Sequence, residues 1–125
     1  MEPPDDTAPP LAAFDRALAL ALMGDDEELL EDLVARLRAT APLLVQKMRD
    51  AVAAGALRDV AHTAHTLRGS SSQLGALETA AACSELETAA EAGAVDVVAH
   101  ALTRVERAVA GLLAALPDGI PQGEP

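Results

Sequence analysis

The sequence has little of several features that other classes of protein require. Tryptophan and tyrosine are absent, Phe14 is the only aromatic residue, and Cys83 is the only cysteine. One cysteine can form neither an intramolecular disulfide nor a multi-cysteine metal site, so the chain needs no oxidising compartment. Nine Lys and Arg stand against twenty Asp and Glu, and the formal charge of −11 would repel a nucleic-acid backbone. We therefore expect no direct binding to nucleic acid.

Long apolar runs are missing as well. A membrane-spanning helix needs about 18 or more consecutive apolar residues, and charged pairs such as Asp15-Arg16 and Glu106-Arg107 interrupt the densest stretches. Residues 1–10 carry acids and four prolines where a signal peptide would carry a basic segment followed by an apolar one. The sequence therefore predicts a cytoplasmic protein without a membrane contact.

Alanine and leucine dominate the 125 residues, a composition that favours helix over sheet in a single domain. Apolar residues recur at three and four positions, and glycines and prolines divide the chain into helical segments. We expect helices over 11–23, 58–74, 76–92 and 95–116, and a further one that begins after Asp25 or Asp26 and reaches Gly55. At Pro42 that helix either kinks or restarts with Thr40 as its cap.

Four long amphipathic helices with short links predict an all-α, antiparallel up-down-up-down four-helix bundle. An additional short N-terminal helix is expected to cover it as a lid. The folded region is predicted over 11–116, with disordered tails at 1–10 and 117–125. The residues expected to face the core are Leu29, Leu30, Leu33, Val34, Leu37, Leu43, Leu44, Met48, Val52, Val60, Ala64, Leu67, Ser71, Leu74, Leu77, Ala80, Cys83, Leu86, Ala90, Val98, Leu102, Val105, Val109, Leu112 and Leu116.

One helix face within this acidic chain is polar and basic. At 100° per residue, the side of helix 58–74 opposite Leu67 carries Arg58, His62, His65, Gly69 and Ser72. We expect this face to bind partner proteins.

His65 has neighbours that suit a phosphorylated imidazole. A neutral histidine can take a phosphoryl group on its basic ring nitrogen without a separate general base. Arg68 follows one helical turn later, where its guanidinium can reach the arriving phosphoryl oxygens. Gly69 leaves a gap beside the imidazole through which a partner's active site can approach.

At these residues the sequence resembles a known family. The motif H-x-L-[KR]-G-S-[SA]-x-x-L-G matches from His65 through Gly75, and C-x-x-L-E matches from Cys83 to Glu87. On these motifs, residues 25–116 resemble a histidine-containing phosphotransfer (HPt) domain, the four-helix intermediate of phosphorelays. Arg68 stands where the family more often has Lys, and Glu87 where some members have Gln.

The resemblance implies that His65 is phosphorylated on Nε2 by the aspartyl phosphate of a receiver domain and passes the group to another receiver Asp. It implies partners among response regulators or hybrid histidine kinases, Mg²⁺ supplied by the receiver, and no independent kinase activity. Arg68 would stabilise the phosphoryl charge. Glu87 would orient the imidazole and keep its Nδ1 protonated.

Other interpretations remain open. A non-catalytic helical adaptor could use the His65 face to bind signalling partners without carrying phosphate. A dimerisation fragment of a histidine kinase is opposed by Thr66, because that class has H-E-x-x-x-P at its histidine. His62 lacks the L-R-G context and is a partner-contact residue; with His65 it lacks a third metal ligand, so no metal site is expected. His100 is interpreted as a surface or packing residue, and Cys83 as a small core residue without a redox role. We expect the protein to be a monomer.

Overall fold

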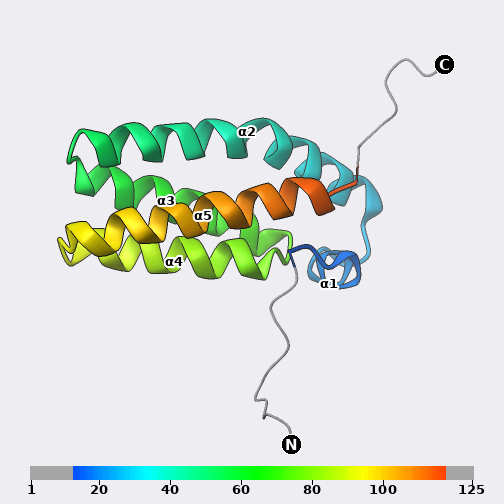
Figure 1. Cartoon of the computed structure of the whole chain (residues 1–125). Coiled ribbons are helices and arrows are strands. Elements are labelled where there is room, and N and C mark those ends of the chain that lie inside the picture. Colours follow the sequence, from blue (N-terminus) through cyan, green and yellow to red (C-terminus); the bar gives the residue numbers. More distant parts are fainter. Residues whose placement is uncertain (1–12, 118–125) are drawn as a thin grey trace, which may run out of the picture.

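The computed structural model describes residues 13–117, and this part of the chain contains five helices and no strand. The helices are α1 (Arg16–Leu22), α2 (Glu27–Ala53), α3 (Leu57–Gln73), α4 (Leu77–Glu91) and α5 (Val95–Ala115). Helices α2 to α5 run alternately in opposite directions and form a bundle, and α1 lies at one end of it (Figure 1). The predicted all-α four-helix bundle with an extra short helix is therefore confirmed. Of the predicted tails, 1–10 and 118–125 lie outside the described residues, and Pro117 is not helical.

Helix α1 is shorter than its apolar pattern indicated. It starts at Arg16, and Ala13 to Asp15 are not helical, so the predicted start at Leu11 is wrong. The physical reason is the N-terminal cap. The Asp15 side chain accepts a hydrogen bond from the Leu18 N–H at 3.0 Å, and this contact sets the first residue of the helix. Leu18 packs against the α3–α4 turn, where a Cβ on Gly75 would come within 2.9 Å of its Cδ2. Helix α1 thus covers this end of the bundle.

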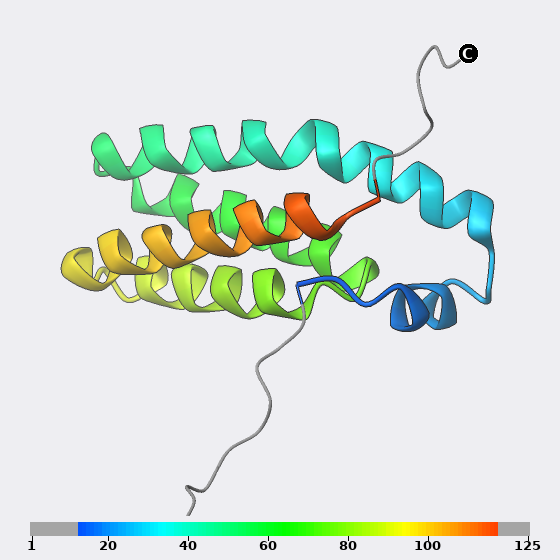
Figure 2. The same ribbon diagram turned by 45° about the vertical axis from the view of Figure 1, so that its right-hand side comes forward.

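Helix α2 continues through Pro42 without a break, so the alternative of a restart capped by Thr40 is wrong. The Thr40 hydroxyl instead donates to the Arg36 carbonyl one turn earlier, at 2.9 Å. Figure 2 shows the axis of α2 changing direction along its length, the bend expected when proline removes a backbone donor. The helix persists because its buried positions keep their spacing across the proline: Leu30, Val34, Leu37, Ala41, Val45 and Met48. At its start, Asp26 is the residue that caps the helix.

The three turns that join α2 to α5 share one design. Gly55, Gly75 and Gly93 each follow the last turn of a helix with a φ of +65° to +70°. The next residue is alanine in every case, and its N–H bonds to a carbonyl five residues earlier, as in Ala76 to Ser71 at 2.8 Å. This is the Schellman arrangement, which needs a left-handed residue and reverses the chain within a few positions. The repeated turn produces the up-down topology.

The core lies between α2, α3, α4 and α5. Every residue predicted to be buried on the third and fifth helices is buried, including Leu67 and Leu112. Three predicted core residues are wrong: Leu29, Leu43 and Leu77 are 41%, 69% and 42% exposed. Leu33, Leu44, Val52 and Ala80 are partly buried.

Helix geometry explains these errors. Leu43 lies two residues from buried Ala41, and Leu77 two from buried Thr79. Two residues along an α-helix are about 200° apart, so both leucines point away from the core. Leu29 lies in the first turn of α2, next to buried Leu30, at the edge of the buried stripe. Ala41 and Thr79, which occupy the buried positions near Leu43 and Leu77, are smaller or less apolar than leucine and gave a weaker apolar signal.

Two further features bear on function. Helices α3 and α4 make the most extensive helix-to-helix contact in the bundle, so side chains on their shared edge are held close together. Among the helices of residues 13–117, none is long and apolar enough to cross a membrane.

Candidate functional site

His65 lies in the middle of α3 on the side that faces away from the core. Its side chain is 61% exposed, although Ala64 before it and Leu67 after it are fully buried. The other residues of the predicted polar face are exposed too: Arg58, His62, Gly69 and Ser72. The helical spacing therefore placed this face correctly.

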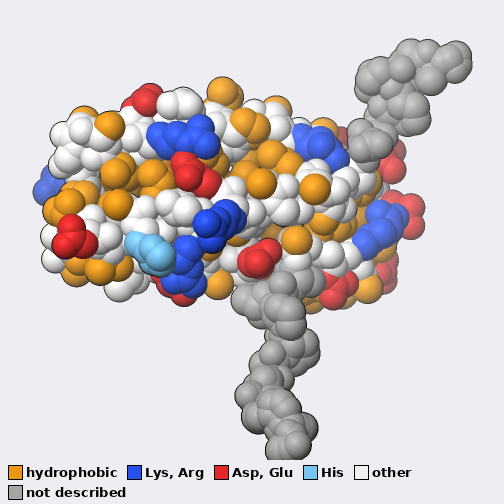
Figure 3. Space-filling view, viewed as in Figure 1, with side chains coloured by type: hydrophobic (Ala, Val, Ile, Leu, Met, Phe, Trp, Pro, Cys, Tyr) orange, Lys and Arg blue, Asp and Glu red, His pale blue; other side chains and the backbone are white. Residues whose placement is uncertain are grey.

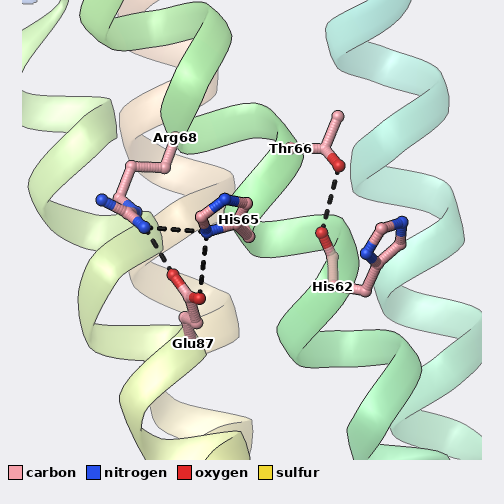
Figure 4. A network of polar contacts seen from close by, with 5 residues as sticks. All are labelled: His62, His65, Thr66, Arg68 and Glu87. Atoms are coloured by element: carbon pink, nitrogen blue, oxygen red, sulfur yellow. Dashed lines mark hydrogen bonds and ion pairs between the residues drawn. The ribbon is translucent and has the colours of Figure 1, made fainter.

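Two charged side chains meet His65 at one of its ring nitrogens. Nδ1 lies 3.1 Å from Oε2 of Glu87 and 2.8 Å from Nη2 of Arg68. The Arg68 Nε also donates to Oε1 of Glu87 at 3.2 Å (Figure 4). One imidazole, one guanidinium and one carboxylate thus form a closed polar cluster.

Glu87 reaches the cluster from α4. Its side chain is 17% exposed, whereas that of Arg68 is 38% exposed. The residue before it, Leu86, is fully buried in the core, which turns Glu87 to the flank of α4 that adjoins α3. The sequence left open whether Glu87 contacts His65, and the structure places the two in contact.

The other ring nitrogen, Nε2, points away from Glu87 and Arg68 in Figure 4. An imidazole whose Nδ1–H donates to a carboxylate keeps a free electron pair on Nε2. The arrangement can therefore present a nucleophilic nitrogen to a partner while the carboxylate fixes the ring.

The surface next to His65 is open. A Cβ added to Gly69, one turn further along α3, would meet no atom within 4 Å beyond its chain neighbours and its own helix backbone. A groove of about 270 Å³ lies between α2 and α3, and Thr66, the residue after His65, is one of its lining residues. Its lining includes Leu33, Leu37, Leu44, Thr66, Ser70 and Leu74.

The remaining histidines lie outside the cluster. The backbone carbonyl of His62 accepts the Thr66 hydroxyl at 3.1 Å, and its imidazole takes no part in the contacts drawn in Figure 4. His100 is an exposed residue of α5. Within residues 13–117, no group of three or more His, Cys, Asp or Glu side chains could hold a metal ion.

The surface formed by α5 and its neighbours, which faces the viewer in Figure 1, differs from the His65 face in its charge distribution. Figure 3 shows positive, negative and apolar side chains intermingled there. Two ion pairs join α5 to its neighbouring helices, one between Arg49 and Glu106 and one between Arg104 and Glu85. A groove of about 420 Å³ between α4 and α5 is lined by three alanines and by the charged side chains of Glu78, Glu85, Arg104 and Arg107.

Cys83 is a core residue, as predicted. It is fully buried on α4, one turn before Glu87, and burial raises the pKa of its thiol to about 12. Of the two charged neighbours, Arg68 lowers this pKa and Glu87 raises it by less, and the value of about 12 includes both effects. The thiol is therefore neutral and shielded at physiological pH, which opposes a redox role.

Two features of the site do not follow from the sequence. Arg68 is predicted to contact the phosphoryl group, but its pairing with Glu87 and its contact with Nδ1 are seen only in the structure. The groove between α2 and α3 is likewise seen only in the structure. The spacing of Thr66 and Ser70 on one side of α3 was the available signal, but a groove depends on how two helices pack and is not encoded in the periodicity of one.

Comparisons with known proteins agree with this geometry. A family model described as Hpt domain matches residues 32–116. The crystal structure of histidine-containing phosphotransfer protein B (HptB) from Pseudomonas aeruginosa PAO1 is similar, with 25% sequence identity and a TM-score of 0.75 over 82% of this chain and 89% of that chain. The HPT domain of the Hpt sensor hybrid histidine kinase from Shewanella shares the fold, with 24% identity and a TM-score of 0.62 over 86% and 98% of the two chains. No curated protein sequence matches this one.

The family match extends over most of the bundle, and it includes His65, Arg68 and Glu87. Members of this family are phosphotransfer carriers that interact with receiver domains of response regulators and hybrid kinases. The chain therefore belongs to the Hpt domain family, whose role is histidine phosphotransfer in phosphorelays.

Proposed function

We propose that His65 is the residue that carries the phosphoryl group. The supporting observation is that His65 is 61% exposed while its Nδ1 is held 3.1 Å from a carboxylate oxygen of Glu87. Nε2 attacks the phosphorus of a receiver's aspartyl phosphate. The N–P bond forms as the P–O bond to the aspartyl group breaks, and the aspartate leaves as a carboxylate. The reverse step passes the group to a second receiver.

Glu87 acts as the residue that orients the imidazole. When Nε2 bonds to phosphorus while Nδ1 keeps its proton, the ring becomes positively charged. The carboxylate beside Nδ1 stabilises that charge, and its hydrogen bond fixes the angle of the ring. Its fixed position follows from its low exposure and its second bond, to Arg68.

Arg68 supplies positive charge to the phosphorylated state. A phosphoryl group brings up to two negative charges, and a guanidinium within reach can donate to its oxygens. In this structure the guanidinium lies at Nδ1, so it has to move toward Nε2 to make that contact. The partial exposure of the side chain leaves room for the movement.

The receiver binds to the exposed face of α3. Arg58, His62, Gly69 and Ser72 lie on the same face as His65, and the groove between α2 and α3 extends this surface with apolar side chains. The open space at Gly69 allows the receiver's aspartyl phosphate to reach the imidazole. The receiver also supplies the Mg²⁺ of the reaction.

The protein itself acts as a carrier without kinase activity, as a monomer in the cytoplasm. The second candidate is an adaptor that binds receivers through the His65 face and carries no phosphate. The exposed basic face supports either role, but the Nδ1 contact with Glu87 favours the carrier, because docking alone requires no oriented imidazole.

Incubation with phosphorylated receiver domains distinguishes the two. The carrier gains a phosphate that is labile in acid and stable in base, as expected for phosphohistidine. His65→Gln abolishes the label, whereas the matched variants His62→Gln and His100→Gln retain it. If the label persists on His65→Gln but is lost from His62→Gln, the phosphoryl acceptor is His62 and the proposal for His65 is wrong. A wild-type protein that binds a receiver yet gains no label from any phosphorylated receiver of a panel would be an adaptor.

A further inference from the structure

The contacts of His65 Nδ1 contain a chemical conflict. Arg68 Nη2, at 2.8 Å, can only donate a hydrogen bond, and an ionised Glu87 Oε2, at 3.1 Å, can only accept one. A single ring nitrogen cannot serve both at once. If Nδ1 carries a proton it donates to Glu87, and if it has none it accepts from Arg68.

The two alternatives differ in reactivity. A neutral imidazole carries one proton on its two nitrogens. With the proton on Nδ1, Nε2 has a free electron pair and can attack phosphorus. With the proton on Nε2, that pair is absent and the exposed nitrogen cannot form an N–P bond. The Glu87-bound tautomer is therefore reactive, and the Arg68-bound tautomer is not.

We propose that Arg68 is a positioning residue that restrains unphosphorylated His65 by stabilising its unreactive Nε2–H tautomer. The inference rests on the proposed function of His65 as phosphoryl acceptor. Arg68 Nε donates a hydrogen bond to Glu87 Oε1 at 3.2 Å. This bond fixes the guanidinium in the position from which Nη2 contacts Nδ1. The distance from Nη2 to Nδ1 is also the shorter of the two contacts to that nitrogen.

Phosphoryl transfer removes the restraint. Before attack, exposed Nε2 gives its proton to solvent water and Nδ1 takes one from solvent. Nδ1 then has no electron pair to accept from Arg68. The guanidinium loses this partner as negatively charged phosphoryl oxygens arrive at Nε2. One side chain thus opposes reaction before transfer and stabilises the product afterwards, and an approaching receiver that draws Arg68 away from Nδ1 activates its own acceptor.

The test measures the tautomer directly, without any phosphorylation. Ring ¹⁵N chemical shifts of His65 are recorded at alkaline pH, where imidazole side chains are neutral. In the wild type we expect a substantial Nε2–H population. Arg68→Ala is expected to lower the ratio of Nε2–H to Nδ1–H about fivefold, the effect of losing one modest charge-assisted hydrogen bond. Arg58→Ala, which removes a cation from the same helix away from His65, leaves the ratio unchanged.

The outcomes separate this inference from the proposed function. An equal ratio in wild type and Arg68→Ala, with both folded by circular dichroism, would overturn the inference. An equal fall of the tautomer ratio in Arg58→Ala would overturn it too, because the ratio would then depend on the net charge of the protein and not on the contact of Arg68 with Nδ1. If Arg68→Ala does not fold, Arg68→Met decides in its place, because methionine keeps a long side chain but has no hydrogen-bond donor. A shifted ratio in a protein that takes no phosphate on His65 would leave the tautomer preference standing and overturn the proposed function instead.

Discussion

Arg68 and Glu87 face each other across the contact between α3 and α4, with Nε of the guanidinium 3.2 Å from Oε1 of the carboxylate. The other oxygen of Glu87 lies 3.1 Å from His65 Nδ1. One carboxylate therefore links the guanidinium and the imidazole. A change at either member of the pair alters the environment of the histidine, and the variants below use this link.

Substitution of Arg68 is expected to affect the phosphorylated state more than docking. Arg68→Ala shortens the lifetime of phospho-His65 and lowers its equilibrium level several-fold, because a cation near the phosphoryl oxygens is lost. Arg68→Lys keeps most of the activity, since it keeps the charge. The measurement is the decay of labelled phosphoprotein, with titration of an unphosphorylated receiver beside it. Loss of receiver binding with normal phospho-His65 would make Arg68 a docking contact.

Removal of the Glu87 carboxylate is expected to slow phosphorylation of His65 by roughly tenfold, the usual size of effect for a partner that orients a reactive imidazole. Glu87→Ala leaves Nδ1–H without an acceptor, whereas Glu87→Gln offers an amide oxygen and retains part of the rate. Initial rates of phosphate uptake check this. Glu85→Gln is the matched control, because Glu85 lies on α4 but pairs with Arg104. Equal rates in Glu87→Ala and wild type would show that the contact has no function.

A bulky side chain at residue 69 is expected to slow transfer although it improves helix propensity. The space beside Gly69 is empty, so Gly69→Gln folds normally and its side chain obstructs the receiver. Gly111→Gln is a suitable control, since Gly111 is an exposed helical glycine of α5 with equally open surroundings. Transfer rates and thermal unfolding are compared for both. Unchanged transfer in Gly69→Gln would mean that the receiver does not use this gap.

Gly75→Ala is expected to destabilise the fold more than Gly55→Ala. Both glycines have φ near +65° to +70°, where an L-residue costs about 1–2 kcal/mol. Only at Gly75 does the new Cβ also meet a side chain, Leu18, at 2.9 Å. Urea unfolding gives the two free energies. Equal losses would indicate that α1 moves aside without cost and does not stabilise this end of the bundle.

Stability at alkaline pH is expected to depend on Cys83. Burial raises the pKa of the folded thiol from 9.0 to about 12. Above pH 9 the unfolded chain loses this proton and the folded chain keeps it, so the free energy of unfolding falls by about 1.4 kcal/mol per pH unit until the folded pKa is reached. Cys83→Ala has no thiol, so its free energy of unfolding does not fall for this reason. The difference in free energy of unfolding between wild type and Cys83→Ala therefore becomes smaller between pH 9 and 11. A constant difference in urea unfolding over this range would contradict the shift.

The helices and their faces followed from local pattern. The stripe Val60, Ala64, Leu67, Ser71 and Leu74 was placed correctly because apolar spacing on a helix reports directly on its buried side. The apolar pattern gave a wrong prediction where a large apolar residue lies on the exposed side, as at Leu43. It was also wrong where a capping residue sets the start of a helix, as at Asp15. Hydrophobicity alone does not encode either effect.

The fold class, the exposed face of α3 and the local context of His65 could be predicted from sequence, because each follows from the spacing of residues along individual helices. The contacts within the site depend on how the helices pack against each other. Glu87 is 22 residues from His65, and whether its carboxylate reaches Nδ1 depends on how α3 and α4 pack. The same packing pairs Arg68 with Glu87 and places a donor and an acceptor at one nitrogen, an arrangement that arises between helices and leaves no periodic signal in either.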